Sequence, residues 1–181
     1  MTEAATWNSP SVANQSDLSQ TVWSIAENGV LAGMIGASVV AVWFLVLDLV
    51  TRGLPFFTPS LLGSIIFAGL TPEQVTGLSG GAIFAYTGLH GILFLCAGFA
   101  LAWMFSQFER NPQAGFILLL LFALFEAILW GVGVSMIPAL AGVVGTWAIL
   151  VANVASAAAM FAFLLRRHPH AMESLRRAWD E

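Results

Sequence analysis

Hydrophobic residues form four long runs along this chain, over residues 28–50, 81–105, 113–137 and 141–165. Each run has about 23 to 25 residues and would span roughly 34 to 38 Å as an α-helix, which rises ~1.5 Å per residue. The hydrocarbon core of a bilayer is about 30 Å thick, so each run is long enough to cross it. The pattern therefore predicts an all-α membrane protein with four transmembrane helices.

A fifth apolar run, over residues 59–70, lies between the first two predicted spans and is too short to cross a membrane. Thr58-Pro59 and Thr71-Pro72 each look like a helix N-cap followed by proline at the first helical position. We therefore expect a short re-entrant or interfacial helix between the first and second spans.

Polar sequences at the two ends predict further elements around a transmembrane domain over residues 21–166. Residues 1–20 are rich in Ser, Asn and Gln and have no Lys or Arg, so they lack the basic start of a secretory signal peptide. We expect a poorly ordered tail there, with Asp17 capping an amphipathic helix that leads into the first span. Within residues 167–181, Met172, Leu175 and Trp179 would share one face of a helix while Arg176 and Arg177 point elsewhere, which predicts a second amphipathic helix, in a cytoplasmic tail.

The composition agrees with a membrane location. Of the 181 residues, 59% are hydrophobic and only 9% are charged, and the mean hydropathy is +0.86. These values are typical of an integral membrane protein and not of a soluble domain. No basic stripe is present, which argues against a nucleic-acid partner.

The arginine residues predict the orientation, because cytoplasmic loops carry an excess of positive charge. Four spans would place five arginines on the same side as the N-terminus: Arg110, Arg166, Arg167, Arg176 and Arg177. Only Arg52 would lie on the other side. We therefore expect the protein in a bacterial inner membrane, with both termini on the cytoplasmic side. An alternative with five spans, in which residues 55–70 also cross, is left open, but the short length of that segment favours four.

Small residues and one charged pair predict how the spans pack. Gly29 and Gly33 form a GxxxG motif in the first span, which allows a neighbouring helix to approach closely. The fourth span is rich in alanine, so we expect other helices to cover it on more than one side. Asp48 and Arg52 are four residues apart at the end of the first span and are placed to pair at the membrane interface.

Polar residues lie at matched depths in three of the predicted spans. His90, Glu126 and Asn153 are each roughly 14 to 18 Å of helix from the same membrane face, near the bilayer midplane. We predict a buried polar layer with these members: His90, Glu126, Asn153, Tyr86, Thr87 and Ser156. Hydrogen bonds within such a layer would fix the order and rotation of the helices.

Packing alone does not explain a glutamate at position 126, because a serine, threonine or asparagine would serve equally well. A carboxyl group at the midplane must in addition be paired or protonated. No complete set of catalytic residues accompanies it. We therefore favour a subunit or accessory component of a larger membrane complex over an enzyme, with the bilayer and other membrane subunits, or a second copy of the chain, as partners.

Two other functions stay open at this stage. His90 and Glu126 could handle protons or cations in a small channel or transporter. His90 could instead bind a b-type haem or contact a quinone, with a second histidine supplied by another subunit. A metal site built by this chain alone is not expected, because helix-borne ligand spacings such as Glu-x-x-His are absent from the sequence.

Overall fold

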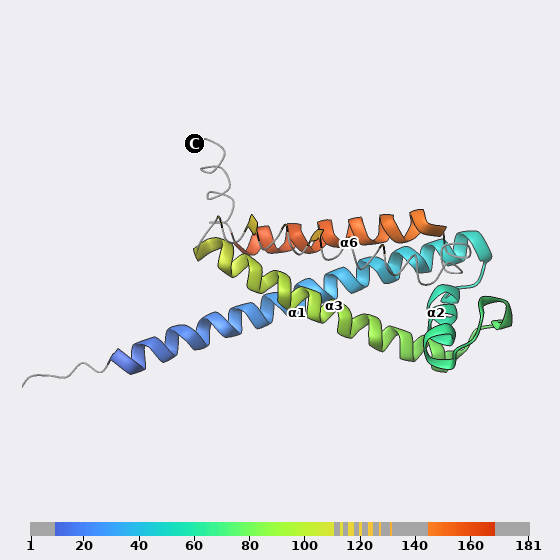
Figure 1. Ribbon diagram of the computed structural model, residues 1–181, viewed down its shortest axis with the longest axis horizontal. Helices are drawn as coiled ribbons and strands as arrows, with labels where there is room; N and C mark the ends of the chain where they lie inside the picture. The colour runs from blue at the N-terminus through green and yellow to red at the C-terminus, as the bar shows by residue number, and fades with distance from the viewer. Residues whose placement is uncertain are drawn as a thin grey trace, which may run out of the picture.

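The computed structural model of the protein is a helical bundle (Figure 1). It describes residues 10–110 and 145–168 and, between these ranges, the following single helical positions: Gln113, Phe116, Ile117, Leu120, Ala123, Leu124, Ala127 and Gly131. Side chains are described from Val22 to Phe108 and at the later described positions. Within this part of the chain the regular elements are α1 (Pro10–Arg52), α2 (Phe57–Ala68), the 3-10 helix η1 (Pro72–Gln74), α3 (Gly80–Arg110) and α6 (Thr146–Arg167).

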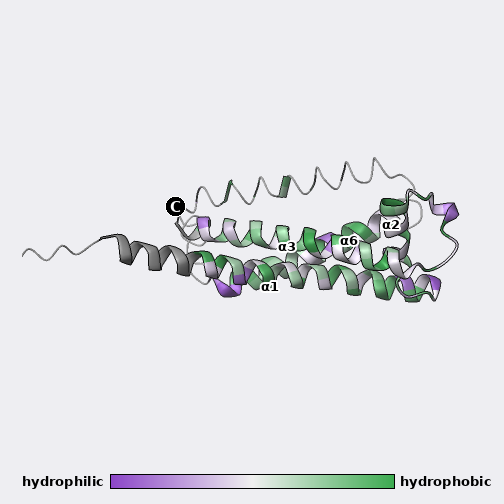
Figure 2. Cartoon of the chain, turned by 90° about the horizontal axis from the view of Figure 1, so that it is seen from below, coloured by the Kyte–Doolittle hydropathy of each residue, from purple (hydrophilic) through white to green (hydrophobic). Residues whose placement is uncertain are grey.

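Three of the described helices are long and apolar enough to cross a membrane: Val22–Arg52 in α1, Gly80–Phe108 in α3, and Thr146–Arg167. They correspond to the first, second and fourth predicted spans, although the last begins five residues later than predicted. Most of the third predicted span, residues 113–137, lies outside the described residues. Figure 2 shows mainly hydrophobic residues along the helix bodies and hydrophilic ones near the helix ends and in the α2–α3 connection.

α1 is one continuous helix of 43 residues, where the sequence predicted a tail and a separate short helix. It is already helical at Pro10, so residues 10–20 belong to it and Asp17 lies inside the helix instead of at an N-cap. No Gly or Pro between Pro10 and Gly29 interrupts the chain, and a helix that already exists extends without a new nucleation cost. Residues 1–9 lie outside the described part.

α1 crosses α3 at glycine residues that allow the two backbones to approach (Figure 1). A Cβ atom added to Gly33 would lie 2.5 Å from the carbonyl oxygen of Phe94, and one added to Gly98 would overlap the carbonyl oxygen of Gly29. Earlier residues of α1 therefore meet later residues of α3, and the two helices are antiparallel. The close approach predicted from the GxxxG motif is confirmed.

α6 packs along α1, also in the opposite direction. At one end, Asn28 Nδ2 lies 3.4 Å from His168 Nε2. Toward the other end, Trp43 Nε1 donates a hydrogen bond to the carbonyl oxygen of Ala148 at 3.0 Å. Beyond His168, the predicted amphipathic tail lies outside the described residues.

The buried apolar core lies where the C-terminal halves of α3 and α6 meet α1. Phe105 of α3 packs edge-on against Phe161 of α6, with ring centroids 5.2 Å apart. The core residues are Ala32, Leu101, Ala102, Phe105, Phe108, Met160 and Leu164. Because α3 and α6 both end at this core, they run in the same direction.

α2 lies across the opposite end of the bundle, in the connection from α1 to α3 (Figure 1). Thr58 of α2 binds Asp48 near the end of α1, and Gly63 packs directly on the carbonyl group of Ala82 near the start of α3. One end of the bundle thus holds both contacts, so α2, with 12 residues, does not cross. The alternative in which residues 55–70 form a fifth span is therefore wrong.

The two Thr-Pro pairs begin their helices in different ways. η1 begins as predicted, with Thr71 as N-cap and its N–H donating to Gln74 Oε1 at 2.8 Å. α2 begins at Phe57, one residue before Thr58, and its N-cap residue is Phe56, in a left-handed conformation with φ 65° and no side-chain hydrogen bond. The prediction of an N-cap at Thr58 is wrong, and another residue takes that role.

Candidate functional site

His90 lies on α3 where that helix faces α1. Its Nε2 is 3.3 Å from the carbonyl oxygen of Ala37. Its ring lies between those of Tyr86 and Phe94, at centroid distances of 5.9 and 4.6 Å. Residues four apart share a helix face, which produces this stack. The structure therefore brings Tyr86 and His90 together, beside the α1–α3 contact.

Ser156 makes a matching contact from α6. Its side chain is buried, and its Oγ donates to the carbonyl oxygen of Gly36 at 3.2 Å. Gly36 and Ala37 are consecutive, so His90 and Ser156 contact neighbouring carbonyl groups of α1 from two sides. A carbonyl oxygen has two lone pairs and can accept such a contact in addition to its bond within the helix.

Two ion pairs mark the ends of the membrane-crossing part of α1. Glu27 Oε1 lies 3.5 Å from Arg167 Nη2 at one end, and Asp48 Oδ1 lies 3.4 Å from Arg52 Nη1 at the other. The two acids are separated by about 32 Å of helix, close to the ~30 Å of a hydrocarbon core. The two carbonyl groups that His90 and Ser156 contact lie about halfway between, at the level expected for the bilayer midplane.

Asn153 and Thr87, which were predicted to be buried in the same layer, are exposed. Ser156 is three positions after Asn153, a rotation of about 300°, so turning Ser156 toward α1 leaves Asn153 on the flank of α6. The Thr87 side chain is exposed on α3, away from the Ala37 contact of His90. The predicted burial of these two residues is therefore corrected, while Glu126 lies outside the described residues and its place in the layer stays a prediction.

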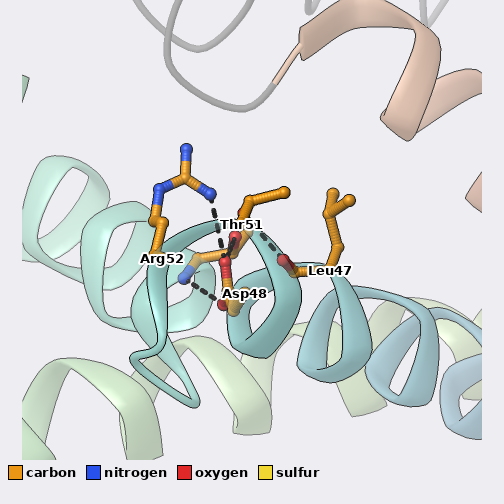
Figure 3. Close-up of polar contacts among 5 residues, drawn as sticks. Leu47, Asp48, Thr51 and Arg52 are labelled. Carbon is orange, nitrogen blue, oxygen red and sulfur yellow. Dashed lines mark hydrogen bonds and ion pairs between the residues drawn. The ribbon is translucent and has the colours of Figure 1, made fainter.

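A polar cluster lies at the junction of α1 and α2 (Figure 3), and only its Asp48–Arg52 pair was predicted. Asp48 is 0% exposed. One of its carboxylate oxygens accepts the backbone N–H of Thr58 at 2.7 Å, and the other accepts the Thr58 hydroxyl at 2.7 Å. The guanidinium of Arg52 pairs with the same carboxylate and lies 4.7 Å from the ring centroid of Phe57.

Asp48 acts as an N-cap for α2 from a different helix. The first N–H groups of an α-helix have no partner within the helix, and the N-cap side chain usually accepts one of them. Phe56 cannot do this, so Asp48 accepts the Thr58 N–H, and its negative charge suits the positive end of the helix dipole. The predicted pairing of Asp48 with Arg52 is confirmed, but the carboxylate is buried. The sequence signal was a single acid late in an apolar run, shortly before a Thr-Pro pair.

The hydrogen bonds and contacts of His90, Ser156 and Asp48 each join one helix to another. Among the described residues, no group of three or more His, Cys, Asp or Glu side chains could hold a metal ion. A haem iron would need one of the two ring nitrogens of His90, and the contact of Nε2 with the Ala37 carbonyl group leaves Nδ1 as the other nitrogen. Cys96 is a free thiol on the exposed side of α3.

No family model matches the chain, and neither a curated protein nor a solved structure matches it.

Proposed function

We propose that this protein is a subunit or accessory component of a larger complex in the bacterial inner membrane, and not an enzyme. It would cross the membrane four times, with both termini in the cytoplasm. The parallel direction of α3 and α6 supports the four crossings. The exposed side chain of Asn153 supports the proposal that the protein belongs to a complex.

The parallel direction of α3 and α6 supports a fourth crossing. Both helices end at the same core, so the chain between Arg110 and Thr146 has to return to the opposite end of the bundle before α6 begins. A span in this segment would place Arg110 and Arg167 on the side where α1 begins and leave Arg52 on the other. This is the charge distribution that assigns the arginine-rich side to the cytoplasm.

The observation that carries the proposal of a complex is the side chain of Asn153. It is exposed on α6, about 21 Å of helix from Arg167, and therefore within the hydrocarbon layer. It makes no hydrogen bond to any residue in the described part of the chain. A carboxamide without a hydrogen-bond partner in an apolar medium costs several kcal/mol. A polar group on a neighbouring transmembrane helix would remove that cost.

The surface around Asn153 is suited to close helix packing. α6 uses small residues against α1, where Ala148 and Ala152 are buried, and it also exposes small residues elsewhere: Ala155, Ala157, Ala158 and Ala162. Small residues allow helix backbones to approach and are enriched at helix contacts in membranes. Within the described residues α6 is covered by α1 and, at one end, by α3. The alanine-rich sequence predicts that further helices cover α6, and in this proposal a helix of another subunit does so.

Co-purification tests this proposal. A tagged chain extracted from its native membrane in mild detergent is expected to bring other membrane proteins with it. Asn153→Leu should weaken their binding roughly 5- to 30-fold, as expected for the loss of about 1 to 2 kcal/mol from an interhelical hydrogen bond. Asn153→Gln keeps the carboxamide and should retain the partners. Thr87→Val, which also removes an exposed polar group from a span, serves as the matched control.

Two outcomes would contradict the proposal. The first is a wild-type chain that purifies alone under these conditions. The second is an Asn153→Leu variant that keeps its partners but unfolds more easily than wild type, because the Asn153 partner would then lie within the same chain. The transporter alternative instead requires a proton or cation flux that Glu126→Gln abolishes, and the haem alternative requires a Soret band that His90→Ala removes.

A further inference from the structure

α2 buries three polar side chains together with Leu61 on its inner side and exposes apolar side chains on its outer side, where a helix on the surface of a soluble protein is polar. Its buried residues include Thr58, Ser60 and Ser64. Its exposed residues include Ile66 and Phe67, which are 46% and 55% exposed. The outer side of α2 is therefore unsuited to water.

The inner side of α2 is firmly held. In addition to the carboxylate cap from Asp48, the Ser60 hydroxyl accepts the backbone N–H of Ser79 at 2.9 Å, which ties α2 to the start of α3. Gly63 packs so closely on Ala82 that an added Cβ would overlap the Ala82 carbonyl group. These contacts fix the rotation of α2 and leave its apolar side facing outward.

Exposed large apolar residues are present on α2 and also on the ends of the two spans that adjoin it in the chain. The exposed large apolar residues from the end of α1 to the start of α3 are Leu49, Val50, Leu54, Phe56, Ile66, Phe67, Leu70, Leu78 and Phe84. On the spans, such a surface is the one that lipid acyl chains cover. The same occupant suits the outer side of α2, which is apolar like the spans, although the polar residues Thr51 and Arg52 lie between α2 and the apolar end of α1.

The depth of α2 follows from its attachment to Asp48. That residue lies about 32 Å of helix from Glu27, at the boundary of a hydrocarbon layer about 30 Å thick. α2 lies across the bundle at this level (Figures 1 and 2). The neighbouring η1 is exposed, and hydrogen bonds from its own backbone and from Thr71 lower the pKa of Glu73 below its usual value. An ionised carboxylate belongs in water, so η1 suits the aqueous side of a membrane surface and the apolar outer side of α2 suits the lipid side.

We propose that α2 is an interfacial lipid-binding helix: Ile66 and Phe67 insert between acyl chains at the membrane face where α1 ends, and Asp48 holds the helix at that depth. This selects the interfacial form of the predicted short helix over the re-entrant form. The proposal does not depend on the subunit function or on a partner of α6.

Spin labelling in liposomes tests the lipid contact. The only native cysteine is removed by Cys96→Ala, and single cysteines are introduced by Phe67→Cys, Ile66→Cys and, as a matched control in η1, Gln74→Cys. A nitroxide at residue 67 or 66 should collide with oxygen, which dissolves in lipid, more than with a water-soluble nickel chelate. The preference should reverse at residue 74. A label at residues 66 and 67 that the nickel chelate reaches as easily as at residue 74 would overturn the proposal, and so would labels that neither reagent reaches, because protein would then cover the helix.

The role of Asp48 is tested in the same labelled protein. Asp48→Asn removes the negative charge of the cap and should increase the mobility of the label at residue 67 and its access to the nickel chelate. Glu27→Gln neutralises the acid at the other end of α1 and should change neither. If Asp48→Asn does not fold, Thr58→Val removes one of the two bonds to the carboxylate and is expected to act in the same direction. Unchanged label mobility in the variant that folds would contradict the proposed role of Asp48.

Discussion

The contact between Asp48 and Thr58 gives the sharpest prediction about stability. Thr58→Val replaces the hydroxyl by a methyl group of similar size, so it removes the 2.7 Å bond to the carboxylate and leaves the backbone N–H bond in place. Bonds to charged groups contribute about 1.5 to 3 kcal/mol in proteins, and those measured between transmembrane helices reach about 1.7 kcal/mol. Asp48 is fully buried, so water cannot replace the lost donor. We expect a loss of about 1.5 kcal/mol, where the two ranges overlap.

Thr51 lies on the last turn of α1, next to Asp48, and provides a matched control (Figure 3). Its hydroxyl also makes a 2.7 Å bond, but to the Leu47 carbonyl oxygen of its own helix, and its side chain is exposed. Such a bond back to the preceding turn adds little to helix stability. Thr51→Val should therefore change the free energy of unfolding by less than about 0.5 kcal/mol, the usual limit for surface substitutions.

Equilibrium unfolding in mixed micelles measures both variants. The mole fraction of SDS is raised in a constant neutral detergent, and unfolding is followed by the fluorescence of the seven tryptophans. The Thr58→Val midpoint should fall clearly below those of wild type and Thr51→Val. Equal midpoints for the two variants would refute the reasoning, because they would mean that the hydroxyl of Thr58 does not stabilise the buried carboxylate.

The same titration checks two further predictions. Gly98→Ala should lower the free energy of unfolding by about 1 to 3 kcal/mol, because its Cβ would overlap backbone atoms of Gly29 and Gly33 that cannot move aside. Gly91→Ala has open space around the added atom and should be neutral or stabilising by up to about 1 kcal/mol. Equal effects of the two variants would mean that the helices do not meet at Gly98. Ser156→Ala should lower the free energy of unfolding by only about 0.6 kcal/mol, the average for interhelical hydrogen bonds in a membrane. A loss above about 2 kcal/mol would contradict this, because the bond to Gly36 would then stabilise the fold more than an ordinary interhelical hydrogen bond.

Features that depend on neighbouring residues could be predicted from the sequence. The apolar runs gave the three candidate spans, the GxxxG motif gave the close approach of Gly29 and Gly33 to α3, and Thr71-Pro72 gave the start of η1. Each of these depends on length, on side-chain size or on the conformations of a few consecutive residues. The pairing of Asp48 with Arg52 belongs to the same group, because four residues along a helix bring two side chains together.

The rotation of each helix could not be predicted in the same way. In a soluble helix the contrast between polar and apolar faces shows which side is buried, but in these spans nearly every face is apolar. Ser156 and Asn153 are both small polar residues on α6, and only the packing on Gly36 shows that the first is buried and the second exposed. The structure therefore brings His90 and Ser156 against neighbouring carbonyl groups of α1, whereas Asn153 and Thr87 are exposed.

The cap of α2 shows the same limit at a larger separation in sequence. Asp48 and Thr58 are joined only because the chain reverses between them through Gly53 and Phe56, both in left-handed conformations with φ near 65°. For Phe56 that conformation is unfavourable, and local sequence gives no reason to expect it. Once the reversal exists, the buried carboxylate and the unpaired N–H groups of α2 satisfy each other. Either group alone would be costly in an apolar environment. The reversal and the cap therefore support each other, and a variant that weakens one is expected to loosen the other.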